Sequence, residues 1–238
     1  AVVLVGLYGS SITHSAHIRS WNSWVAKNTI VIEDAAQHWL ANECQRIGDV
    51  AAISFDPMKN LSCYGNGGAV VTDIPDLYYF AQEWRDAAKP GHHYAGTNSR
   101  MSEIDCAQML VKTKYIDQWQ KRREKIATYW VERLHNTGIR SLIDEHNSHD
   151  HAFHKFVIFT EKRDILQQNL AIRKIETKIH YKNPLHEIGM FSKYPGPGML
   201  AAASSMCRGI LSLPIYPELT DLEVEHIAST ITNYYKNY

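Results

Sequence analysis

The ten residues N-T-I-V-I-E-D-A-A-Q at positions 28–37 decide the fold class of this 238-residue chain. Their apolar run is typical of a short buried strand, and small and polar residues follow it at once. A second apolar run, A-V-V-L-V, occupies positions 1–5, and residues 13–27 carry large apolar side chains at helical spacing between the two. Strands that alternate with helices in this way favour a mostly parallel sheet covered by helices.

Downstream of this unit the same alternation continues and then changes. Further short strands are expected at 50–55 and 68–72, with a loop rich in glycine and polar residues between them. From position 102 the pattern is helical. S-E-I-D at 102–105 resembles a capping box with Asp in the place of Glu, and it predicts two helices or one long kinked helix from 104 to 134.

The last hundred residues predict a smaller α/β domain. T-D-L-E at 220–223 is a capping box that predicts a final helix ending near residue 235. The other elements expected are a strand at 154–159, a helix at 164–172 and a strand at 178–181. We therefore expect a large domain over 1–125 and a small carboxyl-terminal domain over 126–238.

Composition excludes several classes of function. Lys plus Arg equals Asp plus Glu at 25 each, so no net charge attracts nucleic acid or an anionic membrane. The four cysteines form no C-x-x-C pair, and no apolar run approaches the roughly 20 residues that span a bilayer. These features predict a cytoplasmic protein without structural zinc or disulfides. Since the chain opens directly on a strand without an initiator Met, we also expect an amino-terminal part of the protein to be absent from it.

Two polar groups follow neighbouring predicted strands. Glu33-Asp34-Ala-Ala-Gln37 follows one strand, and Ser54-Phe-Asp-Pro-Met-Lys59 follows the next. Ligands of open α/β sheets bind at the carboxyl ends of the strands, where both groups would emerge. An isolated Asp at a strand end is more often a helix cap, and a lone loop Lys is usually a solvated charge. The case for a site depends on the two groups occurring together.

The residue types match the needs of pyridoxal 5'-phosphate (PLP). This cofactor requires a lysine that forms a Schiff base with its aldehyde and a carboxylate that keeps the pyridine nitrogen protonated. Lys59 and Asp34 are of those types. Ser54 could help to bind the phosphate, and Gln37 could reach a ring oxygen.

Four ordered motifs resemble the DegT/DnrJ/EryC1/StrS family of sugar aminotransferases. They are V-I-E-D-A-A-Q at 31–37, G-D-V-A-A-I-S-F-D-P-M-K-N at 48–60, G-N-G-G-A-V-V-T at 65–72 and G-T-N-S-R-M-S-E-I at 96–104. L-S-L-P-I-Y-P-E-L-T at 211–220 also looks like that family's sequence before its last helix. The resemblance implies an aspartate-aminotransferase-like (type I PLP) fold.

The resemblance also implies roles for single residues. Lys59 would be the Schiff-base lysine and the base that moves the proton, Asp34 the partner of the pyridinium nitrogen and Ser54 a phosphate ligand. Gln37 would contact the side of the ring that carries the hydroxyl. Asn98 matches an asparagine that reaches the cofactor phosphate of the neighbouring subunit, which implies a homodimer with shared active sites.

Five further residues are weaker candidates for substrate binding. His180, Tyr181 and His186 match an H-Y-x-x-P-L-H stretch of the family near the sugar nucleotide, although a strand that ends at a proline turn explains them equally well. His92 could line the cleft. Arg100 could contact a ligand or simply anchor the start of a helix. We expect no metal, because His146, His149, His151 and His154 lack the spacing of a metal motif and are more typical of a polar loop.

The implied reaction transfers an amino group, with glutamate as the expected donor, to a nucleotide-diphospho-linked keto-deoxysugar. Two short motifs favour amination at sugar C3 over C4. A PLP-dependent sugar dehydratase would carry histidine in place of Lys59, which argues against that relative. An inactive or regulatory remnant of the family is the other alternative. The missing amino-terminal part would hold the group that stacks on the cofactor ring, so we expect this chain alone to bind PLP poorly.

Overall fold

The protein was analysed as a computed structural model, which describes residues 1–12, 29–41, 47–143, 150–194 and 200–236. The chain divides into two compact units. Unit 1 comprises Ala1–Lys121 and His149–His154, and unit 2 comprises Arg122–Ser148 and Lys155–Tyr238. Among the described residues, no helix is long and apolar enough to cross a membrane.

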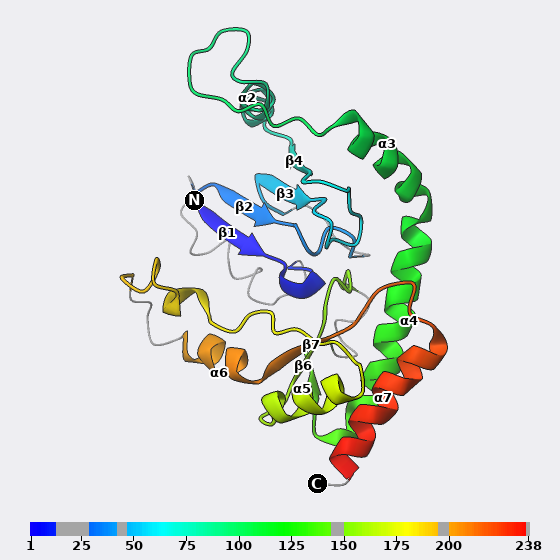
Figure 1. Cartoon of the computed structure of the whole chain (residues 1–238). Coiled ribbons are helices and arrows are strands. Elements are labelled where there is room, and N and C mark those ends of the chain that lie inside the picture. Colours follow the sequence, from blue (N-terminus) through cyan, green and yellow to red (C-terminus); the bar gives the residue numbers. More distant parts are fainter. Residues whose placement is uncertain (13–28, 42–46, 144–149, 195–199, 237–238) are drawn as a thin grey trace. The chain divides into compact units, whose positions relative to one another are not determined.

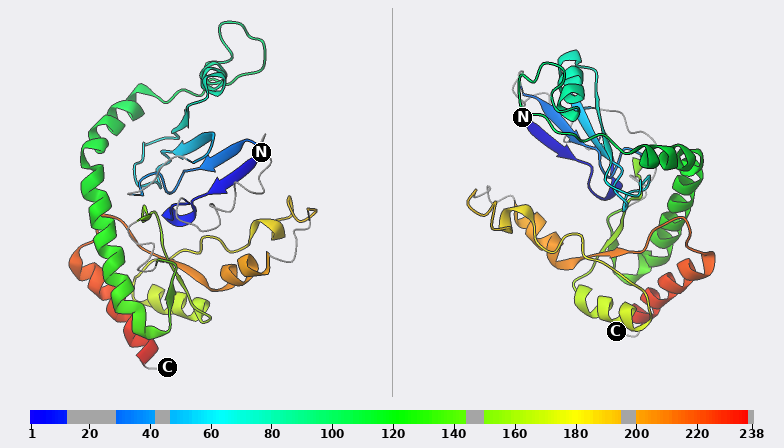
Figure 2. Two further views of the ribbon diagram at one scale, coloured as in Figure 1. Left: turned by 180° about the vertical axis from the view of Figure 1, so that it is seen from behind. Right: turned by 45° about the horizontal axis from the view of Figure 1, so that its top comes forward.

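Unit 1 is built on one four-stranded sheet in the order β1-β2-β3-β4 (Figures 1 and 2). Strands β1 (Val2–Val5), β2 (Val31–Asp34) and β3 (Val50–Ser54) are parallel, and β4 (Gly68–Thr72) pairs antiparallel with β3. The mostly parallel sheet predicted from the sequence is therefore confirmed. The helix expected at 13–27 lies outside the described residues.

Three described helices follow the sheet of unit 1 in the sequence, and the last of them continues into unit 2. Helix α2 (Pro75–Arg85) begins with Pro at its first position, where the missing N–H costs nothing, yet the sequence analysis did not predict it. Helix α3 (Glu103–Lys112) follows Ser102, whose hydroxyl accepts the Asp105 N–H at 3.1 Å. A short 3₁₀ turn, η2 (Thr113–Tyr115), separates α3 from α4 (Ile116–Leu134), so the predicted helical stretch forms two helices.

A small apolar cluster joins α3 to the loop that follows β3. Leu61, Cys63 and Met109 are buried there. Trp39 and Phe55, whose rings meet edge to face at 6.0 Å, pack against the cluster. This contact ties the loop next to Lys59 to the body of unit 1.

Unit 2 has an antiparallel sheet in the order β5-β6-β7. Its strands are β5 (Arg140–Ser141), β6 (Phe156–Phe159) and β7 (Ile210–Leu213). Its described helices are α5 (Arg163–Ile172), α6 (Ala201–Gly209), α7 (Asp221–Lys236) and the part of α4 from Arg122 onward. Besides η2, the described 3₁₀ turns include η1 (Leu7–Gly9), η3 (His135–Thr137) and η5 (Leu185–Glu187). The core of unit 2 forms around Trp130 and Phe156, which are fully buried with ring centroids 5.1 Å apart.

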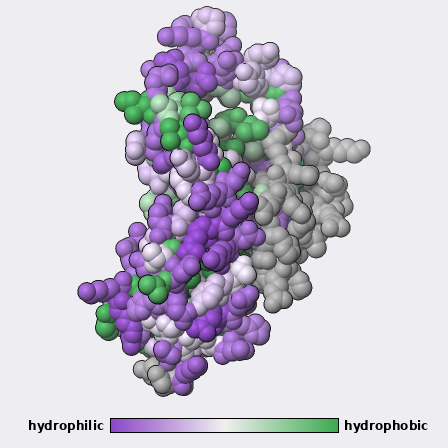
Figure 3. All heavy atoms as spheres, turned by 90° about the vertical axis from the view of Figure 1, so that its right-hand side faces the viewer, coloured by the Kyte–Doolittle hydropathy of each residue, from purple (hydrophilic) through white to green (hydrophobic). Residues whose placement is uncertain are grey.

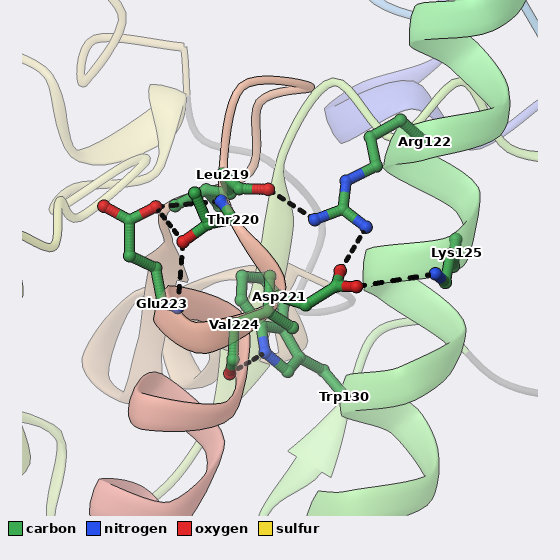
Figure 4. Close-up of polar contacts among 8 residues, drawn as sticks. All are labelled: Arg122, Lys125, Trp130, Leu219, Thr220, Asp221, Glu223 and Val224. Carbon is green, nitrogen blue, oxygen red and sulfur yellow. Dashed lines mark hydrogen bonds and ion pairs between the residues drawn. The ribbon is translucent and has the colours of Figure 1, made fainter.

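The start of α7 is fixed by several polar contacts (Figure 4). The predicted capping box is present: Thr220 N–H donates to Glu223 Oε2 at 2.8 Å, and Glu223 N–H donates to Thr220 Oγ1 at 3.3 Å. Arg122 on α4 binds the Leu219 carbonyl and the Asp221 carboxylate. In the views of Figures 1 and 2, α7 runs beside the later half of α4.

One predicted strand is absent among the described residues. At 178–181 the backbone makes only an isolated bridge between Lys178 and Ser212 before a turn begins at His180. Pro184 follows closely and cannot donate a ladder hydrogen bond, so the turn ends the pairing. The strand prediction was wrong beyond its first residue.

Candidate active site

Asp34 and Ser54 end adjacent parallel strands of unit 1. In the register of β2 and β3, Asp34 lies opposite Ala52, two residues before Ser54. Parallel strands run in one direction, so both side chains emerge at the same carboxyl edge of the sheet, as the sequence predicts. Both are half-buried. One Asp34 oxygen accepts the Ala36 N–H at 3.1 Å, which fixes the carboxylate against the following turn.

Lys59 lies in a turn that begins directly after β3. Ser54 Oγ accepts the Asp56 N–H at 3.3 Å, and Asp56 Oδ1 accepts the Met58 N–H at 2.9 Å. The Lys59 N–H donates to the Asp56 carbonyl at 2.9 Å. Within the described residues, the half-buried Lys59 side chain has no hydrogen-bond or ion-pair partner. Its amine is therefore available to a ligand.

Gln37 contacts the loop that follows β1. Its Oε1 accepts the Tyr8 N–H at 2.8 Å, and Tyr8 has a left-handed backbone with φ 64°. The side-chain amide nitrogen of Gln37 makes no hydrogen bond within the described residues. The three strand-end loops that carry Tyr8, Gln37 and Lys59 thus border the same edge of the sheet.

Glu33, directly before Asp34, is hydrogen-bonded to the buried side chain of His38. His38 Nε2 is 2.8 Å from Glu33 Oε1, and both side chains are almost fully inaccessible. Burial alone would raise the pKa of Glu33, but the His38 hydrogen bond and the Ile47 and Gly48 N–H groups outweigh it and lower that pKa. The His38 ring also occupies the space that a Gly6 side chain would need, because a Cβ there would lie 1.9 Å from Nδ1. The sequence analysis missed this pair.

Asp105 has a second role besides its place in the first turn of α3. Its Oδ1 accepts the Tyr64 and Gly65 N–H groups at 3.0 and 3.1 Å, and its Oδ2 accepts the Ser102 hydroxyl at 2.8 Å. The Ser102 hydroxyl and these two N–H groups lower the pKa of Asp105, against the opposing effect of burial. The carboxylate therefore holds the glycine turn instead of completing a capping box.

Asn98 and Arg100 lie apart from this group. Asn98 forms a backbone bridge with Asp86, which follows α2, and Arg100 pairs with the Asp86 carboxylate at 2.6 Å. Arg85 and then Arg100 lower the pKa of Asp86. A cavity of about 540 Å³ is lined by Asn66, Gly67, Gly68, Arg85, Ser99, Arg100, Met101 and Cys106. Within the described residues, no hydrogen bond or ion pair links Asn98 or Arg100 to Asp34, Ser54 or Lys59.

The other candidate substrate residues are divided between the units. In unit 1, His92 is exposed and its Nδ1 lies 3.2 Å from the Ala87 carbonyl. In unit 2, His180 Nδ1 is 2.8 Å from Ser212 Oγ, and Tyr181 is 53% exposed. Burial, Lys155 and Lys178 lower the pKa of His180, so its ring is neutral at neutral pH.

His186 belongs to a separate polar group of unit 2. Its Nε2 lies 3.0 Å from Ser204 Oγ, and the Ser204 hydroxyl donates to Glu187. The hydrogen bond joins η5 to α6. This contact gives His186 a hydrogen-bond partner within unit 2.

The structure describes only the second half of the histidine-rich segment. His146 and His149 lie outside the described residues. His151 and His154 are buried in unit 1, and burial lowers the pKa of His151 to about 4 against the opposing charge of Asp150. The described residues include no cluster of three groups that could hold a metal ion.

The donor set at the carboxyl edge fits PLP. Asp34 offers an oxygen with no partner among the described residues, which suits a pyridinium N–H. Ser54 keeps its hydroxyl proton for a phosphate oxygen, since it accepts from Asp56. Lys59 offers an amine without a partner. These are the three kinds of group that the cofactor requires.

Comparisons with known proteins agree with this description. The model of the DegT/DnrJ/EryC1/StrS aminotransferase family matches residues 1–232. A dTDP-3-amino-3,4,6-trideoxy-alpha-D-glucose transaminase from Streptomyces venezuelae is 35% identical over 228 residues, which cover 92% of this chain and 59% of that protein.

Solved structures show the same fold. The crystal structure of S. venezuelae DesV in complex with a ketimine intermediate is 32% identical with a TM-score of 0.87, covering 98% of this chain and 64% of that one. Bacillus subtilis NtdA with the bound cofactor PMP, the amino form of PLP, is 26% identical with a TM-score of 0.83, covering 98% of this chain and 56% of that one. The chain thus spans about three-fifths of the proteins it matches, and the predicted fold class is confirmed.

Proposed function

Because this chain belongs to the DegT/DnrJ/EryC1/StrS aminotransferase family, we propose that it acts as a PLP-dependent aminotransferase on nucleotide-diphospho-linked keto-deoxysugars. The observation that carries the proposal is the Lys59 amine, which has no partner among the described residues, in the turn that follows β3 at the edge of the sheet where Asp34 and Ser54 also lie. We assign cofactor binding to residues 1–125 and treat residues 126–238 as the smaller domain. The free Cys63, Cys106 and Cys207 suit the reducing cytoplasm, where we place the protein.

Each residue at the carboxyl edge has a defined task. When bound, PLP supplies an aldehyde that takes up the amino group and a ring that accepts electrons. Lys59 would hold the cofactor through its aldehyde, and its amine would move a proton to and from the donor Cα. Asp34 keeps the ring nitrogen protonated. Ser54 binds the phosphate, and the Gln37 amide approaches the ring oxygen.

The substrates follow from the chemistry and from the relatives. Glutamate would give up its amino group, take an oxygen from one water molecule and leave as 2-oxoglutarate. The amino group would replace the carbonyl oxygen of the keto-sugar, which would leave as a second water molecule, so that no water is consumed overall. The S. venezuelae transaminase is named for a 3-amino sugar, which supports amination at C3. In unit 2, the neutral His180 and the exposed Tyr181 suit hydrogen bonds to sugar hydroxyls.

We further propose a homodimer in which Asn98 serves the neighbouring subunit's cofactor phosphate. Asn98 is exposed and contacts none of the other proposed cofactor residues of its own chain among those described. Hydrophobic side chains are also exposed near α3 (Figure 3), where Ile104, Leu110 and Val111 are 75%, 70% and 55% exposed. A second subunit would remove this apolar surface from water.

The test is transfer of ¹⁵N from [¹⁵N]glutamate to a dTDP-linked 3-keto-6-deoxyhexose. The protein is expressed from its complete reading frame, and the product is analysed by mass spectrometry. We expect a labelled amino sugar from the wild type, none from Lys59→Ala and a strongly reduced yield from Asn98→Ala. When the two variants are coexpressed, activity should return to about a quarter of the wild-type value, because half of the dimers are mixed and each rebuilds one of two sites.

Two results would refute these proposals separately. Unlabelled sugar with the wild-type protein, while PLP is bound, would refute the aminotransferase function for this substrate class. Labelled product from the wild type, without recovery of activity in the coexpressed pair of variants, would support the aminotransferase function and refute the shared active site.

A further inference from the structure

Residues 150–154 form part of unit 1 although the chain on both sides of them belongs to unit 2. Their backbone pairs with residues that follow β1. The Ser11 N–H donates to the Asp150 carbonyl at 3.0 Å, and the Ala152 N–H donates to the Gly9 carbonyl at 2.7 Å. A late segment of the chain is therefore hydrogen-bonded to the rim of the parallel sheet.

Asn60, the residue after Lys59, binds the same segment. Its Nδ2 donates to the Ala152 carbonyl at 2.6 Å, and its Oδ1 lies 3.3 Å from His154 Nδ1. Ala152 and His154 are 1% and 6% exposed. Hydrogen bonds among groups so well shielded from water are stronger and better defined than exposed ones.

Residues 150–154, which bind the Asn60 side chain, are themselves held by hydrogen bonds. The Phe153 N–H donates to His151 Nδ1 at 2.8 Å, and Gln120 Nε2 donates to the His151 carbonyl at 3.3 Å. Gly9 permits the close approach, because its φ is +112° and a Cβ there would lie 2.9 Å from the His154 nitrogen. The segment is thus a fixed support for the side chain of Asn60.

Contacts continue from this support to the other strand-end loops. Gly9, which binds Ala152, follows Tyr8, and the Tyr8 N–H donates to Gln37 Oε1 at 2.8 Å. Residues 150–154 therefore connect the loops after β1 and β3, and the Tyr8–Gln37 bond connects the loops after β1 and β2. Lys59 depends on this arrangement, because its own side chain has no partner among the described residues and its amine is placed by the backbone alone.

We propose that Asn60 is a positioning residue for the proton transfer performed by Lys59. The inference builds on the aminotransferase function proposed above. The Asp56 carbonyl fixes the turn at the Lys59 N–H, and Asn60 fixes it on the carboxyl side by its bond to Ala152. Proton transfer requires reacting atoms held within a fraction of an ångström, and misplacement by about 1 Å can cost on the order of a hundredfold in rate.

The test compares the half-reaction of L-glutamate and L-[2-²H]glutamate with PLP-loaded protein, with rates counted per loaded site. In Asn60→Ala we expect the rate to fall on the order of tenfold and the deuterium isotope effect to rise, because proton transfer becomes more strongly rate-limiting. Asn60→Asp keeps the size of the side chain but cannot donate a hydrogen bond to the Ala152 carbonyl, so it should show the same changes in rate and isotope effect as Asn60→Ala. Asn60→Gln, which retains the donor, should recover part of the rate.

Asn169→Ala is the matched control. Asn169 also makes a side-chain hydrogen bond, to Arg173 at 2.7 Å, but on the exposed surface of α5. The rate and the isotope effect of the Asn169→Ala variant should equal those of the wild type. In protein without cofactor, hydrogen exchange of the amides at 58–62 should be faster in Asn60→Ala than in Asn169→Ala.

The outcomes separate this inference from the proposed function. An unchanged isotope effect in Asn60→Ala, whether or not the rate falls, would overturn the positioning role while the wild-type reaction leaves the aminotransferase standing. A PLP-loaded wild type that does not react with L-glutamate would refute both the aminotransferase function and the positioning role of Asn60.

Discussion

At the scale of single residues, the most heavily buried charge in unit 1 belongs to Glu33, directly before Asp34. Its carboxylate accepts hydrogen bonds from His38 and from two backbone N–H groups. These bonds join the end of β2 to His38 and to residues 47–48, directly beside Asp34 in the sequence. An ionised carboxylate with several donors is well satisfied, whereas the loss of its charge weakens every one of these bonds.

Glu33→Gln should lower the free energy of unfolding at pH 7 by about 1–3 kcal/mol. The pKa of Glu33 in the folded protein lies below its ordinary value of 4.5. Its contribution is therefore complete above that value and is lost as the pH falls through the folded-state pKa. Urea unfolding at several pH values should show the difference between wild type and variant shrinking in acid.

The control is Glu161→Gln, at an exposed position of unit 2. It should change stability by no more than about 0.5 kcal/mol. A Glu33→Gln penalty that stayed constant from pH 7 into acid would contradict the assignment of charge to this carboxylate.

Sequence reasoning identified Asp34, Gln37, Ser54 and Lys59 because strand ends and polar residue types are local signals. It did not identify the hydrogen bonds that hold the Asn60 side chain, since the partners of that side chain lie about ninety residues later in the chain. The turn after β1 has the sequence Gly-Leu-Tyr-Gly at 6–9. Its need for a glycine at position 9 became apparent only when the segment that packs on it was known.

At the scale of elements, helix ends were the most predictable features of the chain. The capping box at the start of α7 closes as expected, and Arg122 adds a bond to the Leu219 carbonyl (Figure 4). The short helices and strands that were missed have weak local patterns. Helix α2 has no buried residue. Its sequence therefore does not need the apolar periodicity by which a helix that packs against a core is recognised.

Thr220→Ala should destabilise the protein by about 1 kcal/mol, because the first turn of α7 loses the side chain that accepts the Glu223 N–H. Ser229→Ala, within the same helix, is the comparison, since Ala is the stronger helix former there and stability should stay equal or rise slightly. Both are measured by urea unfolding of the otherwise identical protein. Equal effects of the two substitutions would show that the cap contributes nothing.

At the scale of the whole molecule, the family match extends over residues 1–232, while the chain spans about three-fifths of the proteins it resembles. The order of motifs along the chain was enough to predict the fold class, because the motifs at 31–37 and 48–60 contain the parallel strands β2 and β3. The sequence could not reveal that residues 150–154 belong to unit 1, because that depends on long-range backbone pairing. The proposed active site thus combines locally encoded groups with a support assembled by the fold.

The most direct test of the central claim is to reduce the PLP-loaded protein with borohydride and to map the modified residue by peptide mass spectrometry. The protein is expressed from its complete reading frame and compared with Lys59→Ala and with Lys112→Ala, since Lys112 instead donates to the Ser62 carbonyl at 2.7 Å. We predict a pyridoxyl group on Lys59 in the wild type and in Lys112→Ala, and none in Lys59→Ala. Labelling of a different lysine, or equal labelling of the Lys59→Ala variant, would contradict the assignment of Lys59 as the residue that carries the cofactor.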